Sequence, residues 1–91
     1  MRLGLRKTRQ FEKDLKRMAK RGMPLRELET VIDRLLDQTP LPEKHRDHPL
    51  VGDYAGFREC HVRPDWVLIY MVQADRLVLT CMRTGTHSDL F

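Results

Sequence analysis

Side chains that transfer protons or carry fixed positive charge gather in the second half of the sequence, at His48, His61, Asp65, Arg83 and His87. Cleavage of RNA through its own 2′-hydroxyl needs a base, an acid for the leaving 5′-oxygen, and cations that hold charge on the phosphate. Histidine and aspartate transfer protons near neutral pH, and arginine keeps its charge. These residue types fit an RNA-cleaving site that requires no metal and no enzyme nucleophile.

Aromatic residues accompany these groups, and each of them also has a structural explanation. Trp66, Tyr54 and Phe91 could stack on unpaired bases and align the bond to be cut. Trp66, however, begins a strongly apolar run, "VLIY", and a tryptophan in that position is more often part of a core. From residue types and spacing alone, a nucleic-acid binding module without catalytic activity is a better interpretation than a nuclease.

Two of the polar groups have further alternatives. Arg83 could serve only as the ion-pair partner of Glu59 or Asp65. His45 and His48 have the His-x-x-His spacing of a metal-ligand pair in "HRDH", which leaves a metal-dependent hydrolase as a third hypothesis. That signal is weak, because no second ligand pair at a suitable spacing accompanies it.

The elements that must position these residues follow from hydrophobic periodicity. Alternating Leu3 and Leu5 predict a short strand, and two amphipathic helices follow, over 9–22 and 24–38, joined by the tight connection "RGMP". A long loop over 41–56 then leads to three strands, predicted at 57–63, 66–72 and 77–83. The order β-α-α-β-β-β predicts one α+β domain over 1–91, with a helical hairpin on a mostly antiparallel four-stranded sheet.

Positive charge is concentrated at the N-terminal end. The chain carries a net charge of +4, whereas residues 1–22 hold nine basic and two acidic side chains, a local balance of 9 − 2 = +7. Such a basic helix suits a polyanion such as RNA or DNA, since each neutralised phosphate releases counterions. A solvated basic face without a ligand is an equally common explanation.

The remaining composition predicts a cytoplasmic protein. Cys60 and Cys81 fall in different predicted strands without a CxxC pair, which favours two buried thiols in a reducing compartment. No apolar run approaches the roughly 20 residues that a membrane span requires. The N-terminal stretch "MRLGLRKTRQ" is too charged for a signal peptide.

A longer pattern covers essentially the whole chain. The runs "DHPL", "GFR", "HVRPDWVLIY", "RTGTH" and a terminal "LF" stand in this order, and "EKDLKR" precedes them. Together they resemble the YafQ branch of the RelE-like toxins of bacterial type II toxin–antitoxin systems. The resemblance implies a sheet flanked by a helical hairpin, in agreement with the elements above.

The resemblance also implies an activity and partners. Members of this family are ribosome-dependent mRNA endonucleases that cut mRNA in the A site, and no cofactor is implied. A cognate antitoxin, which also binds DNA and represses the operon, is the implied protein partner. The basic helix would then dock on ribosomal RNA, which leads us to expect contacts from Lys13, Lys16, Arg17 and Lys20. The alternative is a binding module that blocks translation by occupancy.

Carried over position by position, the family's functional residues fall on His48, His61, Asp65, Trp66, Arg83, His87 and Phe91. Our hypothesis for their roles makes His87 the general acid and either Asp65 or His48 the general base. His61 and Arg83 hold the phosphate, while Trp66 and Phe91 position bases or the tail. This chain departs from its relatives at Arg63, where an acidic residue is common, and we expect that cation to favour ionised Asp65.

Overall fold

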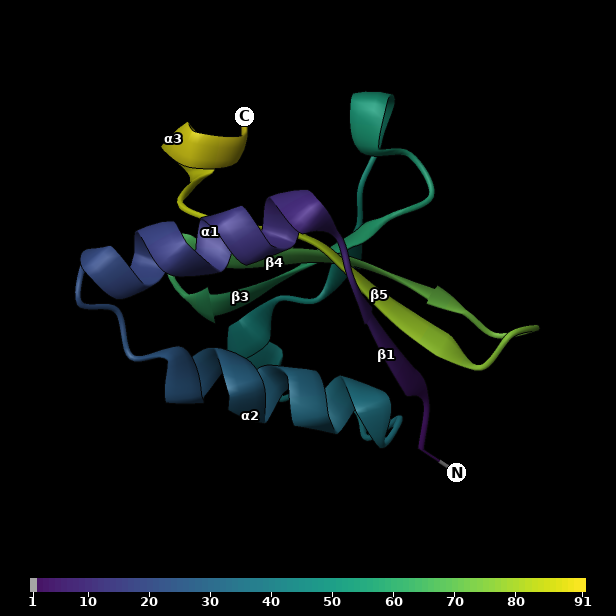
Figure 1. The fold of residues 1–91 in the computed structure, drawn as a ribbon. Coiled ribbons are helices and arrows are strands. Elements are labelled where there is room, and N and C mark those ends of the chain that lie inside the picture. The colour runs from purple at the N-terminus through teal and green to yellow at the C-terminus, as the bar shows by residue number, and fades with distance from the viewer. Residues whose placement is uncertain (1) are drawn as a thin grey trace.

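The computed structural model describes residues 2–91 as one α+β unit of helices and a twisted sheet (Figure 1). The predicted order of the main elements is confirmed, with additions in the long loop and at the C-terminus. The helices and 3-10 turns are α1 (Arg9–Lys20), α2 (Leu25–Leu36), η1 (Glu43–His45), η2 (Gly52–Tyr54) and α3 (His87–Leu90). The strands are β1 (Gly4–Lys7), β2 (His48–Pro49), β3 (Arg58–Arg63), β4 (Trp66–Gln73) and β5 (Val78–Gly85).

The helical hairpin forms where its end signals stand in the sequence. Thr8 caps α1, because its Oγ1 accepts a hydrogen bond from the Phe11 amide at 3.0 Å. Gly22 ends the helix in a left-handed conformation, with a φ of 78°, that costs glycine little. Pro24 then precedes the first turn of α2, where a missing amide proton is not needed.

The sheet has five strands, which corrects the prediction of four. Its order is β1-β5-β4-β3-β2, with β1 parallel to β5 and the other pairs antiparallel. The added strand, β2, pairs His48 with Glu59 and Pro49 with Arg58. Two residues are too few to produce a periodic pattern, so hydrophobic spacing could not reveal this strand.

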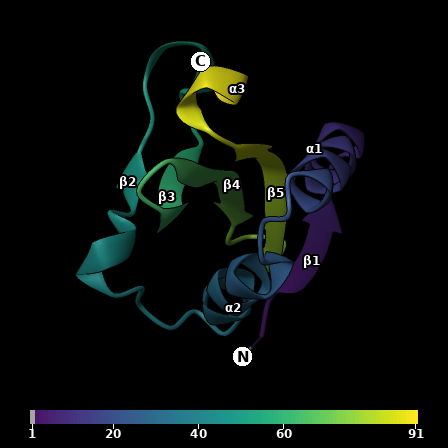
Figure 2. The same ribbon diagram turned by 90° about the vertical axis from the view of Figure 1, so that its left-hand side faces the viewer.

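The sheet is covered on both faces, as the apolar character of β4 predicts. Helices α1 and α2 lie on one face, and α3 lies at the end where β5 leaves the sheet (Figures 1 and 2). The main core lies between helices and sheet and includes Phe11, Leu28, Trp66 and Leu68. A smaller cluster covers the other face, where Leu90 of α3 and side chains of the 50–57 loop pack on β4. Both faces of β4 are therefore buried from Trp66 to Tyr70.

Both cysteines lie in the core, which confirms their predicted burial. Cys60 and Cys81 are fully buried as free thiols. Burial raises the pKa of the Cys81 thiol to about 12, and it raises that of Cys60 further. Neither thiol is therefore a nucleophile at neutral pH.

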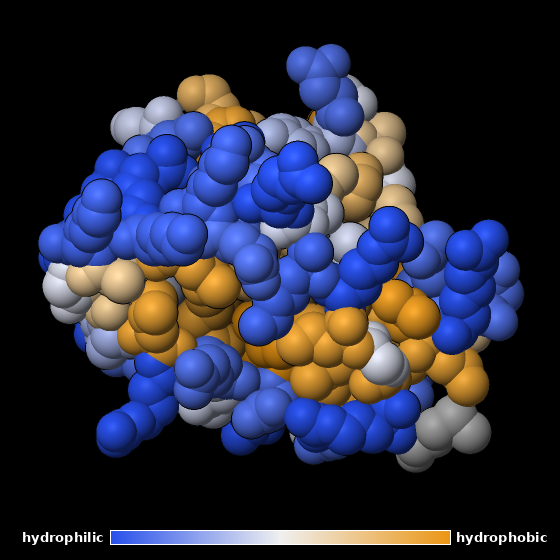
Figure 3. Space-filling model, viewed as in Figure 1, coloured by the Kyte–Doolittle hydropathy of each residue, from blue (hydrophilic) through white to orange (hydrophobic). Residues whose placement is uncertain are grey.

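The surface over the helical hairpin is strongly charged along α1. Hydrophilic side chains cover the outer face of α1, and an apolar band runs between α1 and α2 (Figure 3). Leu15 and Leu25, which are only partly buried, contribute to that band. None of the helices in residues 2–91 has the length and apolar character to cross a membrane.

Candidate functional site

Three histidines from three segments converge on one buried carboxylate. The Nε2 atoms of His48, His61 and His87 lie 3.6, 3.7 and 3.8 Å from Oε1 of Glu59. Glu59 is 4% exposed, and it points from β3 to the same face as His61. Because β2 pairs with β3 opposite Glu59, the extra strand is what brings His48 into this group. We call these four residues the histidine cluster.

The rings of the histidine cluster continue into an aromatic row. Neighbouring ring centroids are separated by 6.2 Å for His48 and His61, and by 5.5 Å for His61 and His87. Phe91 then lies 6.1 Å from His87, and Tyr54 lies 5.6 Å from Phe91. Phe91 is 62% exposed. The cluster therefore ends in an accessible aromatic surface that can stack on a base.

A backbone contact fixes the ring of His48. Its Nδ1 lies 2.6 Å from the carbonyl oxygen of Arg46, and a carbonyl can only accept, so Nδ1 carries the proton. In the neutral ring this leaves the lone pair on Nε2, which faces the cluster. The geometry gives His48 the tautomer that a general base requires.

Asp65 fixes the ring of His87 from the opposite side. Asp65 Oδ1 accepts from the His87 amide at 3.1 Å and lies 2.8 Å from Nδ1. These hydrogen bonds lower the pKa of the Asp65 carboxyl. The ring of His87 thus presents Nε2 to the cluster, while Asp65 is occupied as its partner.

The expected cause of Asp65 ionisation is wrong, although its direction is right. Arg63 does not act on Asp65, because its guanidinium forms two hydrogen bonds of 2.8 Å to Glu27 of α2. His87 supplies the effect instead. Arg63 therefore links the end of β3 to α2.

Arg83 is held by a carboxylate other than the two considered from sequence. Its Nε and Nη2 donate to Asp14 of α1 at 2.8 and 3.3 Å, so pairing with Glu59 or Asp65 is wrong. One extra residue in β5, Met82, separates Arg83 from the regular register with β4, and such bulges re-aim side chains. Asp14 is the main cause of the raised pKa of the guanidinium, and the Tyr54 phenol adds to it, which places Arg83 near the end of the aromatic row.

Trp66 belongs to the core, which corrects its assignment as a base-positioning residue. It is 1% exposed, and its indole Nε1 donates to Thr84 Oγ1 at 2.9 Å. Thr84 Oγ1 donates in turn to the Val67 carbonyl at 2.8 Å. A ring buried in this way cannot stack on a base, and its hydrogen bond joins β4 to β5 within the main core.

The basic face of α1 is present but not uniform. Lys13, Lys16 and Lys20 are exposed. Arg17 is different, because its Nη2 lies 2.7 Å from the buried Asp14 carboxylate. The three lysines are thus available to a polyanion, whereas Arg17 also neutralises Asp14.

The short helix that carries His87 is anchored at its own start. Thr86 and Asp89 form a reciprocal capping box, with hydrogen bonds of 2.9 and 3.2 Å. Arg21, just after α1, donates twice to Asp89 at 2.7 and 3.0 Å. These contacts lower the pKa of the Asp89 carboxyl and tie α3 to the helical hairpin.

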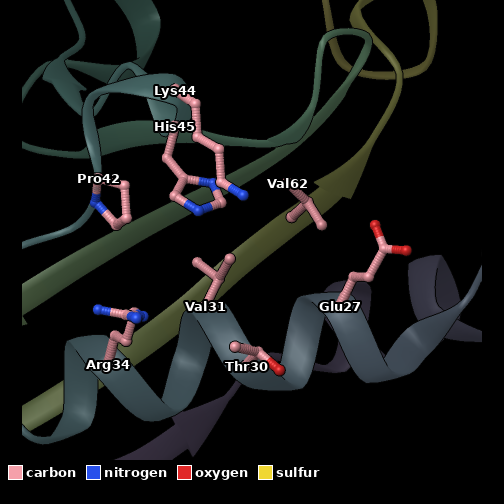
Figure 4. Close-up of a pocket in the computed structure, with 8 residues that line it drawn as sticks. All are labelled: Glu27, Thr30, Val31, Arg34, Pro42, Lys44, His45 and Val62. Carbon is pink, nitrogen blue, oxygen red and sulfur yellow. The ribbon is translucent and has the colours of Figure 1, made fainter.

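The His-x-x-His pair does not form a metal site. His45 turns into a hollow of about 250 Å³ between α2 and η1, among Val31, Glu27 and Arg34 (Figure 4). Its Nδ1 lies 2.6 Å from the His61 carbonyl oxygen. The described ligand atoms that do converge belong to Glu59, His61 and His87, within 4.8 Å of one another. Imidazole and carboxylate are suitable ligands for a transition metal.

Two buried acids were missed from sequence as parts of the site. Glu59 was considered only as a partner of Arg83, and Asp14 only as one charge in a basic segment. One signal was available for Glu59, since strand alternation places it on the face of His61. For Asp14, its i, i+4 spacing from Met18 and i, i+3 spacing from Phe11 placed it on the buried side of α1.

Comparisons with known proteins agree on one family. A family model described as "Bacterial toxin of type II toxin-antitoxin system, YafQ" matches residues 3–91. The Escherichia coli K12 protein "mRNA interferase toxin YafQ" is 45% identical over 83 residues, which cover 90% of this chain and 88% of that protein.

Solved structures give the same result. A metal-bound toxin from Helicobacter pylori has a TM-score of 0.92 and 40% identity, covering 98% of this chain and 99% of that one. The toxin of the E. coli DinJ-YafQ toxin-antitoxin complex has a TM-score of 0.89 and 37% identity, covering 100% and 99% of the two chains.

Proposed function

The chain belongs to the YafQ family of bacterial type II toxins, and from that premise we propose how its histidine cluster cleaves mRNA. Its function is that of an mRNA interferase, an endoribonuclease that inhibits translation. The observation that carries the proposal is the convergence of His48, His61 and His87 on Glu59. The Arg46 carbonyl fixes the ring of His48, and the Asp65 carboxylate fixes the ring of His87.

We assign the general base to His48 and the general acid to His87. His48 Nε2 takes the proton of the 2′-hydroxyl, and that oxygen attacks the adjacent phosphorus to form a 2′,3′-cyclic phosphate. The P–O5′ bond breaks, and protonated His87 donates its Nε2 proton to the leaving oxygen. Asp65 serves as the orienting partner of His87, since its Oδ1 is already engaged there.

Glu59, His61 and Arg83 compensate the charges that develop during this reaction. The Glu59 carboxylate offsets the positive charge that His48 gains when it takes the proton. His61 and Arg83 hold the phosphate as negative charge develops on it. Asp14 fixes the plane of the Arg83 guanidinium, so the arginine needs little reorganisation.

The substrate is mRNA in the ribosomal A site, and α1 supplies the docking surface. Its exposed lysines, Lys13, Lys16 and Lys20, suit contact with ribosomal RNA phosphates without base recognition. Phe91 stacks on a base beside the cut. A cognate antitoxin is the protein partner, in keeping with the E. coli DinJ-YafQ complex. The toxin acts in the cytoplasm, as one domain over 1–91.

Metal binding at the same cluster is a second candidate function. The ligand geometry of Glu59, His61 and His87 favours it, and the H. pylori relative is described as metal-bound. A metal on His61 and His87 would remove the lone pairs or protons used above, so we expect it to inhibit cleavage. Chelation with EDTA should therefore leave the nuclease active, and added zinc should slow it.

The test is the mapping of mRNA 5′ ends on translating ribosomes. The wild type should produce cuts in phase with codons, and His87→Gln should produce none while retaining the fold. Growth arrest with intact mRNA in the wild type would instead support a module that blocks translation by occupancy. Equal cleavage by His87→Gln would reject the acid assignment.

A further inference from the structure

We propose that Lys44 and Arg46 form a binding subsite for one phosphate of the mRNA chain, the phosphate immediately 5′ to the ribose whose 2′-hydroxyl attacks. This inference rests on the proposed function and adds the 5′ to 3′ direction in which the RNA chain lies across the site. The ligand is a phosphodiester of single-stranded RNA.

The subsite is a hollow beside the histidine cluster. It has a volume of about 280 Å³ and is lined by Lys44, Arg46, His61 and Pro64. His61 belongs to both the hollow and the cluster, so the two are continuous. An RNA chain bound across His61 would therefore place the phosphate next to the reacting one beside Lys44 and Arg46.

The two cations of the hollow are available for a ligand. Lys44 and Arg46 are exposed, and neither forms an ion pair within residues 2–91. The neighbouring cations differ, because Asp47 holds Arg58 and Glu27 holds Arg63. Lys44 has only a weak attraction to Glu27, whose carboxylate is already occupied by Arg63. Two uncompensated cations in one hollow suit a phosphate oxygen.

The backbone holds this segment in a defined conformation next to the base. Arg46 adopts a left-handed conformation, with φ 44° and ψ 47°, that non-glycine residues rarely take. Its carbonyl oxygen accepts from His48 Nδ1 at 2.6 Å. The residue that offers its guanidinium to the hollow thus also orients the general base.

The polarity of the RNA follows from the order of the groups. His48 must lie beside the ribose whose 2′-hydroxyl it deprotonates, and His87 must lie beside the leaving 5′-oxygen. The cationic hollow adjoins His48 through Arg46, which lines the hollow and whose carbonyl oxygen contacts His48 Nδ1. At the His87 end a second hollow, of about 560 Å³, includes Tyr54 and Phe91. The 5′ side of the cut therefore lies on cations, and the 3′ side lies on aromatic rings.

The experiment removes the negative charge from single phosphates of a ribosome-bound mRNA. Methylphosphonate, which is uncharged, replaces the phosphate 5′ to the attacking ribose in one RNA and the phosphate 3′ to the cut bond in another. The wild type and Lys44→Gln/Arg46→Gln are compared by cleavage rate at subsaturating toxin. Arg26→Gln/Arg76→Gln, which changes the net charge equally at exposed unpaired positions, is the matched control.

The rate losses caused by the 5′-methylphosphonate and by Lys44→Gln/Arg46→Gln should not be additive. The wild type should lose roughly tenfold in rate on the 5′-methylphosphonate RNA, as expected for a lost charge-assisted contact. Lys44→Gln/Arg46→Gln should lose roughly tenfold on ordinary RNA, and the 5′-methylphosphonate should slow it no further. The control variant should stay as sensitive to the 5′-methylphosphonate as the wild type.

Three outcomes would overturn the subsite. They are a wild type that is insensitive to the 5′-methylphosphonate, a Lys44→Gln/Arg46→Gln variant that stays sensitive to it, and coupling to the 3′ position instead. These outcomes all require that the wild type cleaves ordinary RNA. A wild type that cuts no mRNA would reject the proposed function itself, so the two failures are distinguishable.

Discussion

Two buried carboxylates, one on each side of the sheet, differ in how completely they are satisfied. Asp14 is 1% exposed and accepts from the side chains of Arg17 and Arg83 and from the Thr84 amide, at 2.7 to 3.3 Å. Glu59 is 4% exposed, but its three histidine contacts are 3.6 to 3.8 Å long. Those distances exceed ordinary hydrogen bonds.

The difference separates a structural acid from a reactive one. Fixed arginines hold Asp14, so its charge is neutralised whatever the protonation of the site. Glu59 lies against three histidines, and no arginine or lysine in residues 2–91 forms an ion pair with it. A carboxylate without a permanent cation can respond to proton transfer. We therefore expect Asp14 to govern stability and to affect cleavage only through Arg83, and Glu59 to govern activity.

The largest expected effect is on the free energy of unfolding in Asp14→Asn. Removing the carboxylate leaves Arg83 and Arg17 without their anion and weakens the contact to the Thr84 amide. Loss of one partner of a buried ion pair costs about 3 kcal/mol. Urea denaturation monitored by circular dichroism measures it. Asp33→Asn, which removes an exposed partner of Arg2, is the control and should leave the midpoint unchanged.

Glu59→Gln should reduce cleavage strongly and stability little. The amide keeps the shape but cannot offset the charge on His48, so we expect cleavage to fall roughly a hundredfold. The free energy of unfolding should change by less than about 1 kcal/mol, because no short hydrogen bond is lost. Cleavage assays and denaturation of the same samples decide this. A variant that is fully active and strongly destabilised would remove the distinction between the two acids.

The fold could largely be predicted because its long elements carry strong periodic signals. The helical hairpin and the three later strands fall within a few residues of their predicted bounds. Strand β2 and helix α3 have two and four residues, too few for a period. Both position site histidines, so the parts that escaped prediction are those on which the site depends.

The site could be predicted only as a set of residue types. The three histidines, Asp65 and Phe91 were found because of their chemistry and the resemblance, and the structure groups them. The partners of Arg83 and Arg63 could not be found, because pairing depends on the bulge in β5 and on where α2 passes β3. Trp66 was assigned to base positioning because of the resemblance, although the apolar run that it begins favoured a place in the core, where the structure puts it.

Trp66→Phe tests whether Trp66 affects mainly stability, as expected for Asp14, or mainly cleavage, as expected for Glu59. Its indole reaches Thr84, whose amide also contacts Asp14. Loss of that hydrogen bond and of ring volume should lower the free energy of unfolding by about 1–2 kcal/mol. Cleavage at a temperature where the variant is folded should be unchanged. Phe91→Leu should instead slow cleavage and leave the free energy of unfolding unchanged. Slower cleavage by a stable Trp66→Phe variant would show that Trp66 takes part in substrate binding.

Asp89→Asn has the smallest expected effect and concerns an acid that is intermediate between the two. Asp89 lies near the surface, paired with Arg21 and with the Thr86 amide, and these contacts depress its pKa from 3.8. A depressed folded-state pKa contributes stability that is present above the unfolded-state value and lost as pH falls through the folded-state value. The wild type should therefore exceed Asp89→Asn in denaturation midpoint from neutral pH down to about pH 4, and the two should converge in stronger acid. Since α3 carries His87, cleavage by Asp89→Asn should also fall a few-fold. A difference in denaturation midpoint that stays constant at every pH would show that the cap, rather than the charge, anchors the helix.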